Sequence, residues 1–172
     1  NIAGEHLQSK SFLPRLKAML EQYQNLSPAM LELEILESSA LADMACAQRV
    51  LEETTSLGVL SALDDFGTGY SSLSYLKHLP VGTLKIDQSF VRGMSSDDGD
   101  ATIVRAVIEL ARAFNRGVIA EGVEDAGSME ALIALGCEYG QGYGIARPMH
   151  ENAFVEWIQQ RNTKPVWNHE PP

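Results

Sequence analysis

The chain has 172 residues, of which 45% are hydrophobic, a length and composition that predict one ordinary globular domain. Its formal net charge of −10 argues against a nucleic-acid polymer as partner, because such binding needs lysine and arginine to neutralise phosphates. No apolar run approaches the roughly 18 residues of a membrane span, so we expect no membrane contact from this segment. Cys46 and Cys137 lie far apart without a CxxC spacing, which is typical of reduced thiols in a cytoplasmic protein.

The hydrophobic pattern divides the chain into alternating strands and helices. Apolar residues recur every three or four positions in segments that predict helices at residues 7–24, 38–57, 71–79, 97–115, 127–135 and 151–160. Short apolar or alternating runs between them predict strands at residues 30–37, 59–63, 83–86, 118–120 and 137–139. The last helix is expected to turn Phe154, Val155 and Ile158 inward. We expect one domain over residues 1–162 and a loose tail over residues 163–172, which contain three prolines.

This order of elements predicts the fold class. Strand and helix alternate about five times, which indicates a parallel sheet with crossover helices. Polar or acidic groups at the strand ends favour a TIM-like (β/α)₈ barrel, and an open doubly wound sheet is the alternative. A full barrel needs about three more strands than are visible, and we expect those upstream of Asn1, since the chain does not begin with Met.

Acidic side chains are expected at the carboxyl ends of four strands. They are Glu34, Asp64, Asp65, Asp87 and Glu121. In a barrel these ends converge, and the carboxylates would repel strongly unless one or two divalent cations neutralise them. Oxygen ligands favour Mg²⁺ or Mn²⁺ over zinc, and adjacent aspartates suit a two-metal site. Lys85 lies two residues before Asp87 and therefore points to the same face.

Each of these residues also has a structural alternative. The alternatives are a solvated strand position for Glu34, a turn cap for Asp64 and for Asp87, an ion pair with Arg147 for Glu121, and simple charge balance for Lys85. Glu37 is expected to face solvent or to have a structural role.

Four motifs together resemble the EAL domain family, which comprises phosphodiesterases specific for cyclic di-GMP. They are DDFGTGYSS at residues 64–72, KID at 85–87, AEGVE at 120–124 and QGY at 141–143. The resemblance covers residues 1–148. It implies a TIM-like barrel with an antiparallel first strand, of which the first two strands and most of the third would be missing from this chain. It also implies hydrolysis of cyclic di-GMP to linear 5′-pGpG with Mg²⁺ or Mn²⁺, which lowers a second messenger in bacterial signalling.

The resemblance assigns roles to individual residues. The implied metal ligands are Asn1, Glu34, Asp64, Asp65 and Glu121. The groups implied to act on water or substrate are Lys85, Glu121, Asp65 and Gln141. The residues implied to support the substrate or the loop are Glu37, Asp87, Glu124, Gly67 and Pro148. Residues 67–72 resemble a mobile loop that couples metal binding to dimerisation.

The resemblance further implies partners and exposes two departures. We expect a homodimer and an upstream sensor or diguanylate cyclase-like domain, through which the parent protein could be tethered to a membrane. The Glu-Ala-Leu motif and its following arginine are expected upstream of Asn1. Leu36 stands where the family prefers threonine, which predicts reduced activity. A non-catalytic cyclic di-GMP receptor and a structural module without activity are the competing hypotheses.

Overall fold

The centre of the molecule is a five-stranded parallel sheet. This computed structural model describes residues 1–69 and 73–163, so residues 164–172 of the expected tail and residues 70–72 of the loop lie outside that part. The strands are β1 (Glu32–Leu36), β2 (Leu60–Phe66), β3 (Thr83–Ile86), β4 (Gly117–Glu121) and β5 (Tyr139–Gln141). They are hydrogen-bonded in chain order, each parallel to the next, as consecutive strands of a βα barrel are. Ile2 forms an isolated parallel bridge with Ile35 on the free side of β1.

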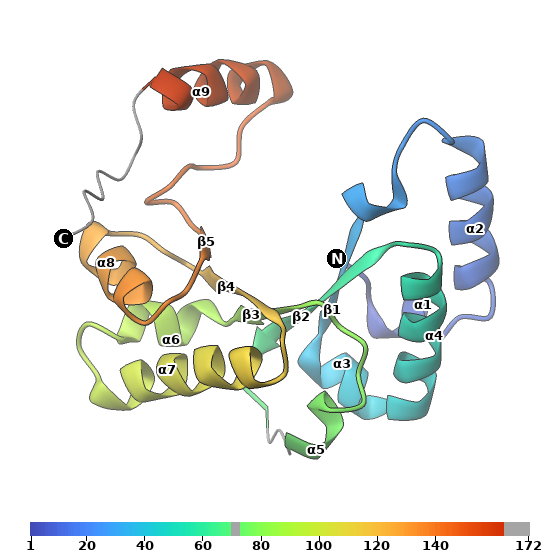
Figure 1. Cartoon of the computed structure of the whole chain (residues 1–172), viewed down its shortest axis with the longest axis horizontal. Helices are drawn as coiled ribbons and strands as arrows, with labels where there is room; N and C mark the ends of the chain where they lie inside the picture. Colours follow the sequence, from blue (N-terminus) through green and yellow to red (C-terminus); the bar gives the residue numbers. More distant parts are fainter. Residues whose placement is uncertain (70–72, 164–172) are drawn as a thin grey trace.

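Helices connect the strands and cover the sheet (Figure 1). They are α1 (Gly4–Leu7), α2 (Phe12–Gln22), α3 (Glu37–Ala42), α4 (Met44–Ser56), α5 (Leu73–Leu76), α6 (Gln88–Gly93), α7 (Asp98–Ala113), α8 (Ala126–Ala134) and α9 (Glu151–Thr163), with a 3₁₀ turn η1 (Pro28–Met30). Helices α1, α2 and α4 lie on one side of the view, α6, α7 and α8 on the other, and α9 stands apart at the top. In the part of the chain that the structure describes, no helix is both long and apolar enough to span a membrane.

The core lies between the sheet and the helices. Leu63, Leu84 and Ile86 of the central strands are completely buried. Val104 and Ala111 of α7 are also completely buried and belong to the same cluster of contacts. Burial of the central strands on both faces is the reason they read as apolar runs, as strands of parallel sheets do.

Two expected helices are each broken in two. Pro14 has no N–H and is tolerated only in a first helical turn, so α2 begins at Phe12 rather than near residue 7. The segment 38–57 is interrupted at Asp43, whose carboxylate accepts a hydrogen bond from the backbone N–H of Cys46 at 3.0 Å and caps α4. Helix α3 begins at Glu37, one residue before the expected start, and its N-cap residue Leu36 forms no capping hydrogen bond through its side chain.

Helix α9 does not bury the face expected from its pattern. Phe154, Val155 and Ile158 are 49%, 54% and 38% exposed, so the prediction that they point inward is wrong. Amphipathic spacing identifies an apolar face but not the partner that covers it.

Candidate active site

One buried lysine contacts acidic side chains on three other strands of the sheet. Nζ of Lys85 on β3 lies 2.7 Å from Glu121 Oε1, 2.9 Å from Glu34 Oε1 and 3.0 Å from Asp64 Oδ1. The four residues share a face because side chains alternate along each strand, which leaves Leu33 and Ile35 to pack on the opposite face. The prediction that Glu34, Asp64 and Glu121 converge is confirmed, and the suggested Glu121–Arg147 pair is wrong.

Lys85 remains charged although it is only 2% exposed. Burial alone would lower the pKa of this amine, but its close contacts with the carboxylates of Glu121, Glu34 and Asp64 outweigh burial and raise the pKa above its ordinary value. The side chains of the three carboxylates are 11–25% exposed, so their outer oxygens can reach a ligand in the mouth of the sheet. The lysine therefore offsets part of the negative charge of the cluster without covering it.

The carboxylates of Asp64, Asp65 and Glu121 have the geometry to hold a metal ion. One oxygen from each lies within 4.8 Å of the other two. Asp64 Oδ1 is a buried oxygen without a well-formed hydrogen bond, although Lys85 Nζ is 3.0 Å away. A set of carboxylate oxygens with one such free acceptor fits a hard cation such as Mg²⁺ or Mn²⁺.

Asp65 and Asp87 form a carboxyl pair beside this cluster. Burial, the hydrogen bond to Asp87 and the charge of Asp64 raise the pKa of Asp65 from 3.8 to about 6. Burial acts in the same direction on Asp87, but hydrogen bonds from the side chain and backbone of Ser89 lower the pKa of that carboxyl overall. Asp87 also caps α6 by accepting from the backbone N–H of Ser89 at 2.9 Å, as one of the structural alternatives predicted. Without metal, the proton of the pair therefore resides on Asp65.

The backbone of Asp65 is in an unusual conformation. Its φ of 55° lies in the left-handed region, which residues other than glycine seldom adopt. Strand β2 continues through Asp64 and Asp65 to Phe66, so both aspartates belong to the strand rather than follow it. The register between β2 and β3 shifts between Leu63 and Phe66, and this irregularity turns two successive carboxylates toward the mouth.

Glu37, the first residue of α3, is connected to the loop that follows β2. It is 1% exposed, so the expectation that it faces solvent is wrong and its structural role is the correct alternative. Glu37 Oε2 accepts a hydrogen bond from the backbone N–H of Gly67 at 3.1 Å, and Oε1 accepts one from the hydroxyl of Tyr75 at 2.6 Å. Gly67 has a φ of 102°, which favours glycine at this position.

Asn1 and Gln141 occupy positions level with the acids. The bridge between Ile2 and Ile35 places Asn1 level with Glu34, next to the free side of β1. On the other side, Gln141 ends β5 directly opposite Glu121. The roles that the resemblance implies for both residues stay predictions.

Glu124 and Pro148 lie outside the acidic cluster. Glu124 forms a half-exposed ion pair with Arg92, in which the atoms are 2.6 Å apart. Pro148 is exposed and lines a separate cavity of about 340 Å³ with Gln141, Tyr143 and residues of α9. Arg147 stacks on the ring of Tyr143 at 4.6 Å.

Sequence reasoning missed two contributors to the site. Tyr75 hydrogen-bonds to Glu37 across 38 positions of sequence, and a buried carboxylate in need of a donor was the one available signal. Thr68 donates its hydroxyl to the backbone carbonyl of Asp65 at 2.9 Å, and threonine three residues after aspartate was a recognisable turn signal.

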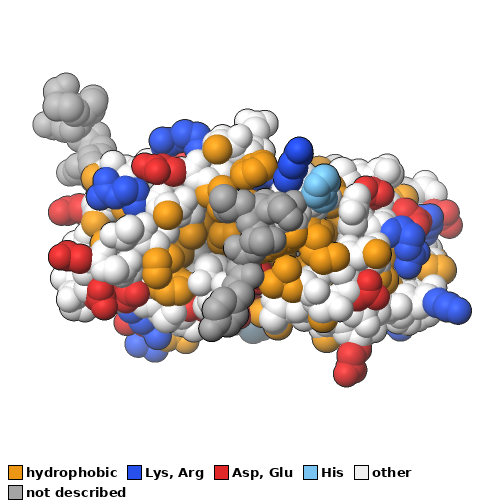
Figure 2. Space-filling view, turned by 90° about the horizontal axis from the view of Figure 1, so that it is seen from below, with side chains coloured by type: hydrophobic (Ala, Val, Ile, Leu, Met, Phe, Trp, Pro, Cys, Tyr) orange, Lys and Arg blue, Asp and Glu red, His pale blue; other side chains and the backbone are white. Residues whose placement is uncertain are grey.

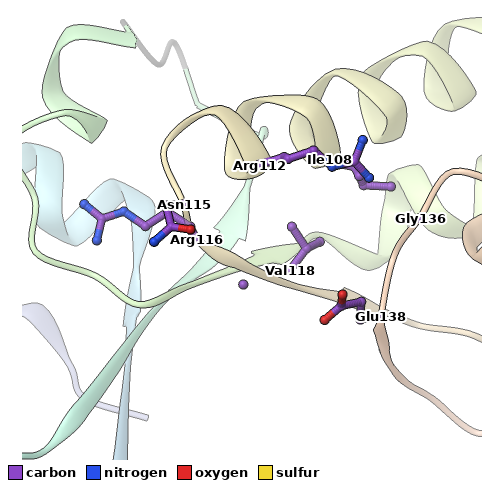
Figure 3. Close-up of a pocket in the computed structure, with 8 residues that line it drawn as sticks. Ile108, Arg112, Asn115, Arg116, Val118, Gly136 and Glu138 are labelled. Carbon is purple, nitrogen blue, oxygen red and sulfur yellow. The ribbon is translucent and has the colours of Figure 1, made fainter.

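A cavity of about 180 Å³ lies at the opposite ends of the strands (Figure 3). It is lined by Gly117 and Val118 at the start of β4, together with Arg112, Arg116 and Glu138. The two guanidinium groups point away from each other in this view, so they do not converge on a common ligand. The acids define the candidate active site, and this cavity is separate from it.

A parallel α/β sheet with a lysine and a group of carboxylates at its carboxyl edge has the layout of a βα-barrel site with the geometry to hold a divalent metal. Comparison with known proteins is more specific, because the EAL domain matches residues 1–148. MucR of Pseudomonas aeruginosa, a bifunctional diguanylate cyclase/cyclic di-GMP phosphodiesterase, is 46% identical over 125 residues, which are 73% of this chain and 18% of MucR. The cyclic di-GMP phosphodiesterase PdeR of Escherichia coli is 36% identical over 160 residues, which are 93% of this chain and 24% of PdeR.

Solved structures point to the same family as these relatives. The MucR phosphodiesterase in complex with c-di-GMP superposes with a TM-score of 0.86 and 38% identity, over 90% of this chain and 62% of the solved chain. The chain belongs to the EAL domain family. The predicted fold class, a TIM-like α/β barrel, is confirmed, while its antiparallel first strand stays a prediction. The chain spans less than a quarter of the length of MucR and of PdeR.

Proposed function

We propose that this domain hydrolyses one phosphodiester bond of cyclic di-GMP to give linear 5′-pGpG, with Mg²⁺ or Mn²⁺ as cofactor. The observation that carries the proposal is the Lys85 cluster. In it, Asp64 and Glu121 approach both the lysine and Asp65, so that one mouth contains a metal-binding set and a fixed positive charge. Relatives named as cyclic di-GMP phosphodiesterases support the choice of substrate.

The proposed reaction adds water across one phosphodiester. The water oxygen bonds to phosphorus, the bond from phosphorus to the ribose 3′ oxygen breaks, and that oxygen takes up a proton. A divalent cation bound by Glu34, Asp64, Asp65 and Glu121, with Asn1 as a further ligand, would lower the pKa of a bound water and polarise the phosphate.

The residues of the chain contribute a preorganised electrostatic environment. Lys85 is held by three carboxylates, so its ammonium can stabilise negative charge on the attacking water or on the phosphate oxygens without rearrangement. Before metal binds, the Asp65–Asp87 pair can hold a proton, because burial and neighbouring carboxylates raise the pKa of Asp65 to about 6, and a cation bound by Asp65 would displace that proton. Gln141, level with Glu121, is proposed to orient water or substrate.

The test compares two single-atom changes in the full-length protein. Glu121→Gln removes a carboxylate of the cluster and should lower pGpG formation by about 100-fold or more, the upper range for groups that hold a metal's ligands. Glu130→Gln makes the same change at an exposed position of α8 and should leave turnover unaffected. Chromatography of nucleotides after incubation with cyclic di-GMP and Mg²⁺ measures both. Intact cyclic di-GMP bound by the wild-type protein would instead establish the receptor hypothesis.

A homodimer and further domains are also part of the proposal. Helix α7 presents an apolar hollow of about 480 Å³ lined by Ile103, Ala106, Val107 and Leu110, which supports association. Hydrophobic side chains also gather over the middle of the face that Figure 2 shows. Light scattering of the full-length protein would test the dimer, and a monomer at assay concentration would contradict it. The sensor or cyclase-like domain and the cytoplasmic location stay predictions.

A further inference from the structure

The carboxylate of Glu37 connects both ends of one segment. Its Oε2 accepts from the backbone N–H of Gly67, directly after β2, and its Oε1 accepts from the hydroxyl of Tyr75 on α5. Gly67 and Tyr75, which lie on either side of residues 70–72 in the sequence, therefore form hydrogen bonds with the same buried side chain. A carboxylate that is 1% exposed needs such donors, because a buried polar group without hydrogen-bond partners is strongly unfavourable.

The Tyr75 contact has the properties of a strong, directional hydrogen bond. The O–H···O distance is 2.6 Å, within the range of charge-assisted bonds between hydroxyl and carboxylate. Tyr75 is 5% exposed, so its ring is fixed by the core and its hydroxyl cannot follow Glu37 if the carboxylate rotates. The other side of Glu37 is closed as well, since a Cβ on Gly69 would lie 3.4 Å from the carboxylate. Glu37 is thus held in one orientation, with Oε2 toward Gly67.

Glu37 is connected to the metal-binding carboxylates through two residues that follow Asp65 in the chain, Gly67 and Thr68. Gly67 is two positions from Asp65, whose φ of 55° is a conformation that the surrounding structure must hold. Thr68 adds a second restraint by donating its hydroxyl to the carbonyl of Asp65. If Gly67 were released from Glu37, Asp65 could relax toward ordinary strand geometry and turn its carboxylate away from Asp64 and Glu121.

We propose that Tyr75 is a positioning residue that acts through Glu37 to hold Asp65 in its metal-binding conformation. It touches neither metal nor substrate. The inference rests on the proposed metal site and adds to it a residue in α5, beyond the loop itself. The hydroxyl, rather than the ring, is the effective group.

The experiment removes that hydroxyl and measures metal binding directly. Mn²⁺ affinity of the full-length protein is measured without nucleotide, from the electron paramagnetic resonance signal of free Mn²⁺. Tyr75→Phe should weaken Mn²⁺ binding by about 10- to 100-fold, the range found when an outer partner of a metal ligand is lost. Tyr23→Phe makes the same change at an exposed position and should have no effect.

A double-mutant cycle separates positioning from packing. If Tyr75 acts through Glu37, adding Tyr75→Phe to Glu37→Gln should change Mn²⁺ affinity no further. Effects that multiply in the double variant, or unchanged affinity in Tyr75→Phe, would overturn the proposal. If Tyr75→Phe does not fold, as judged by circular dichroism, Glu37→Gln alone decides, and unchanged Mn²⁺ affinity in that variant would overturn the proposal.

The Mn²⁺ measurement is independent of the proposed reaction. Wild-type protein that binds Mn²⁺ but forms no pGpG would contradict the proposed function and leave the cycle to decide the role of Tyr75. Wild-type protein that forms pGpG without measurable Mn²⁺ binding would overturn the role of Tyr75 and leave hydrolysis standing.

Discussion

Replacing Lys85 by methionine tests how the acidic cluster is stabilised before metal binds. Methionine keeps an apolar stem of similar length and removes only the ammonium. Three carboxylates within 2.7–3.0 Å of Nζ then lose their one shared counter-charge. Removing one partner from a buried ion pair costs about 3–5 kcal/mol. Because these carboxylates are 11–25% exposed and partly solvated, we expect a loss near the lower end, about 3 kcal/mol.

A divalent cation should reverse most of this loss. Wild type also binds the cation, so the loss shrinks only if the variant binds it more tightly. Without the ammonium beside the carboxylates, Lys85→Met should bind Mg²⁺ about 100-fold more tightly than wild type, which is worth about 2.7 kcal/mol at saturation and is close to the expected loss. The free energy of unfolding of wild type and Lys85→Met would be measured by urea denaturation in EDTA and in saturating Mg²⁺. Lys17→Met is the matched control, because Lys17 pairs with Glu53 at 3.3 Å on the surface and should matter by less than about 1 kcal/mol in either condition.

Two results would refute this reasoning. A loss below about 1 kcal/mol in EDTA would mean that Lys85 does not offset the repulsion among Glu34, Asp64 and Glu121. An equal loss in EDTA and in Mg²⁺ would mean that removing the ammonium does not tighten binding of the cation.

Two further predictions concern Asp65 and Leu36. The pKa of Asp65 is about 6 in the folded protein, against an ordinary value of 3.8. In EDTA, the contribution of Asp65 to the free energy of unfolding should therefore be fully present below pH 3.8 and be lost as the pH rises through 6. The loss is up to about 3 kcal/mol, at about 1.4 kcal/mol per pH unit. Asp65→Asn should abolish this slope in urea denaturation at pH 4–6, and a variant with the wild-type slope would exclude Asp65 as its source. Leu36 is 39% exposed and stands at the N-cap of α3 without a side-chain hydrogen bond, so Leu36→Thr should add a cap worth about 1 kcal/mol and raise turnover. Leu36→Val has the same shape as threonine without the hydroxyl, and an equal gain in melting temperature from both variants would argue against capping.

The site was largely predictable because parallel strands impose its geometry. Once strands were expected at residues 83–86 and 118–120, Lys85 and Glu121 had to meet near one edge of the sheet. The fold class followed from the same alternation of strand and helix. The pattern of apolar residues and the order of the strands were therefore sufficient to predict the fold class and the approach of Lys85 to Glu121.

Details that depend on contacts between distant residues were not predictable in the same way. The break at Pro14 had a local cause that the periodic pattern of apolar residues concealed. The orientation of α9 depends on what its apolar face meets, and periodicity carries no information about that. The Tyr75–Glu37 hydrogen bond joins α5 to α3 across 38 positions of sequence, so only the folded structure reveals it.

The position of Lys85 explains how the folded protein can hold several carboxylates close together and still leave them available to bind metal. The lysine shares its charge among three carboxylates but forms no well-shaped hydrogen bond with Asp64 Oδ1. Asp64 also contributes one carboxylate oxygen to the group of acceptors that Asp65 and Glu121 complete. A lysine that fully satisfied every acid would compete with the cation, and one farther away would leave the acids to repel one another. Lys85 therefore lowers the electrostatic cost of assembling the site while leaving Asp64 with an acceptor for metal.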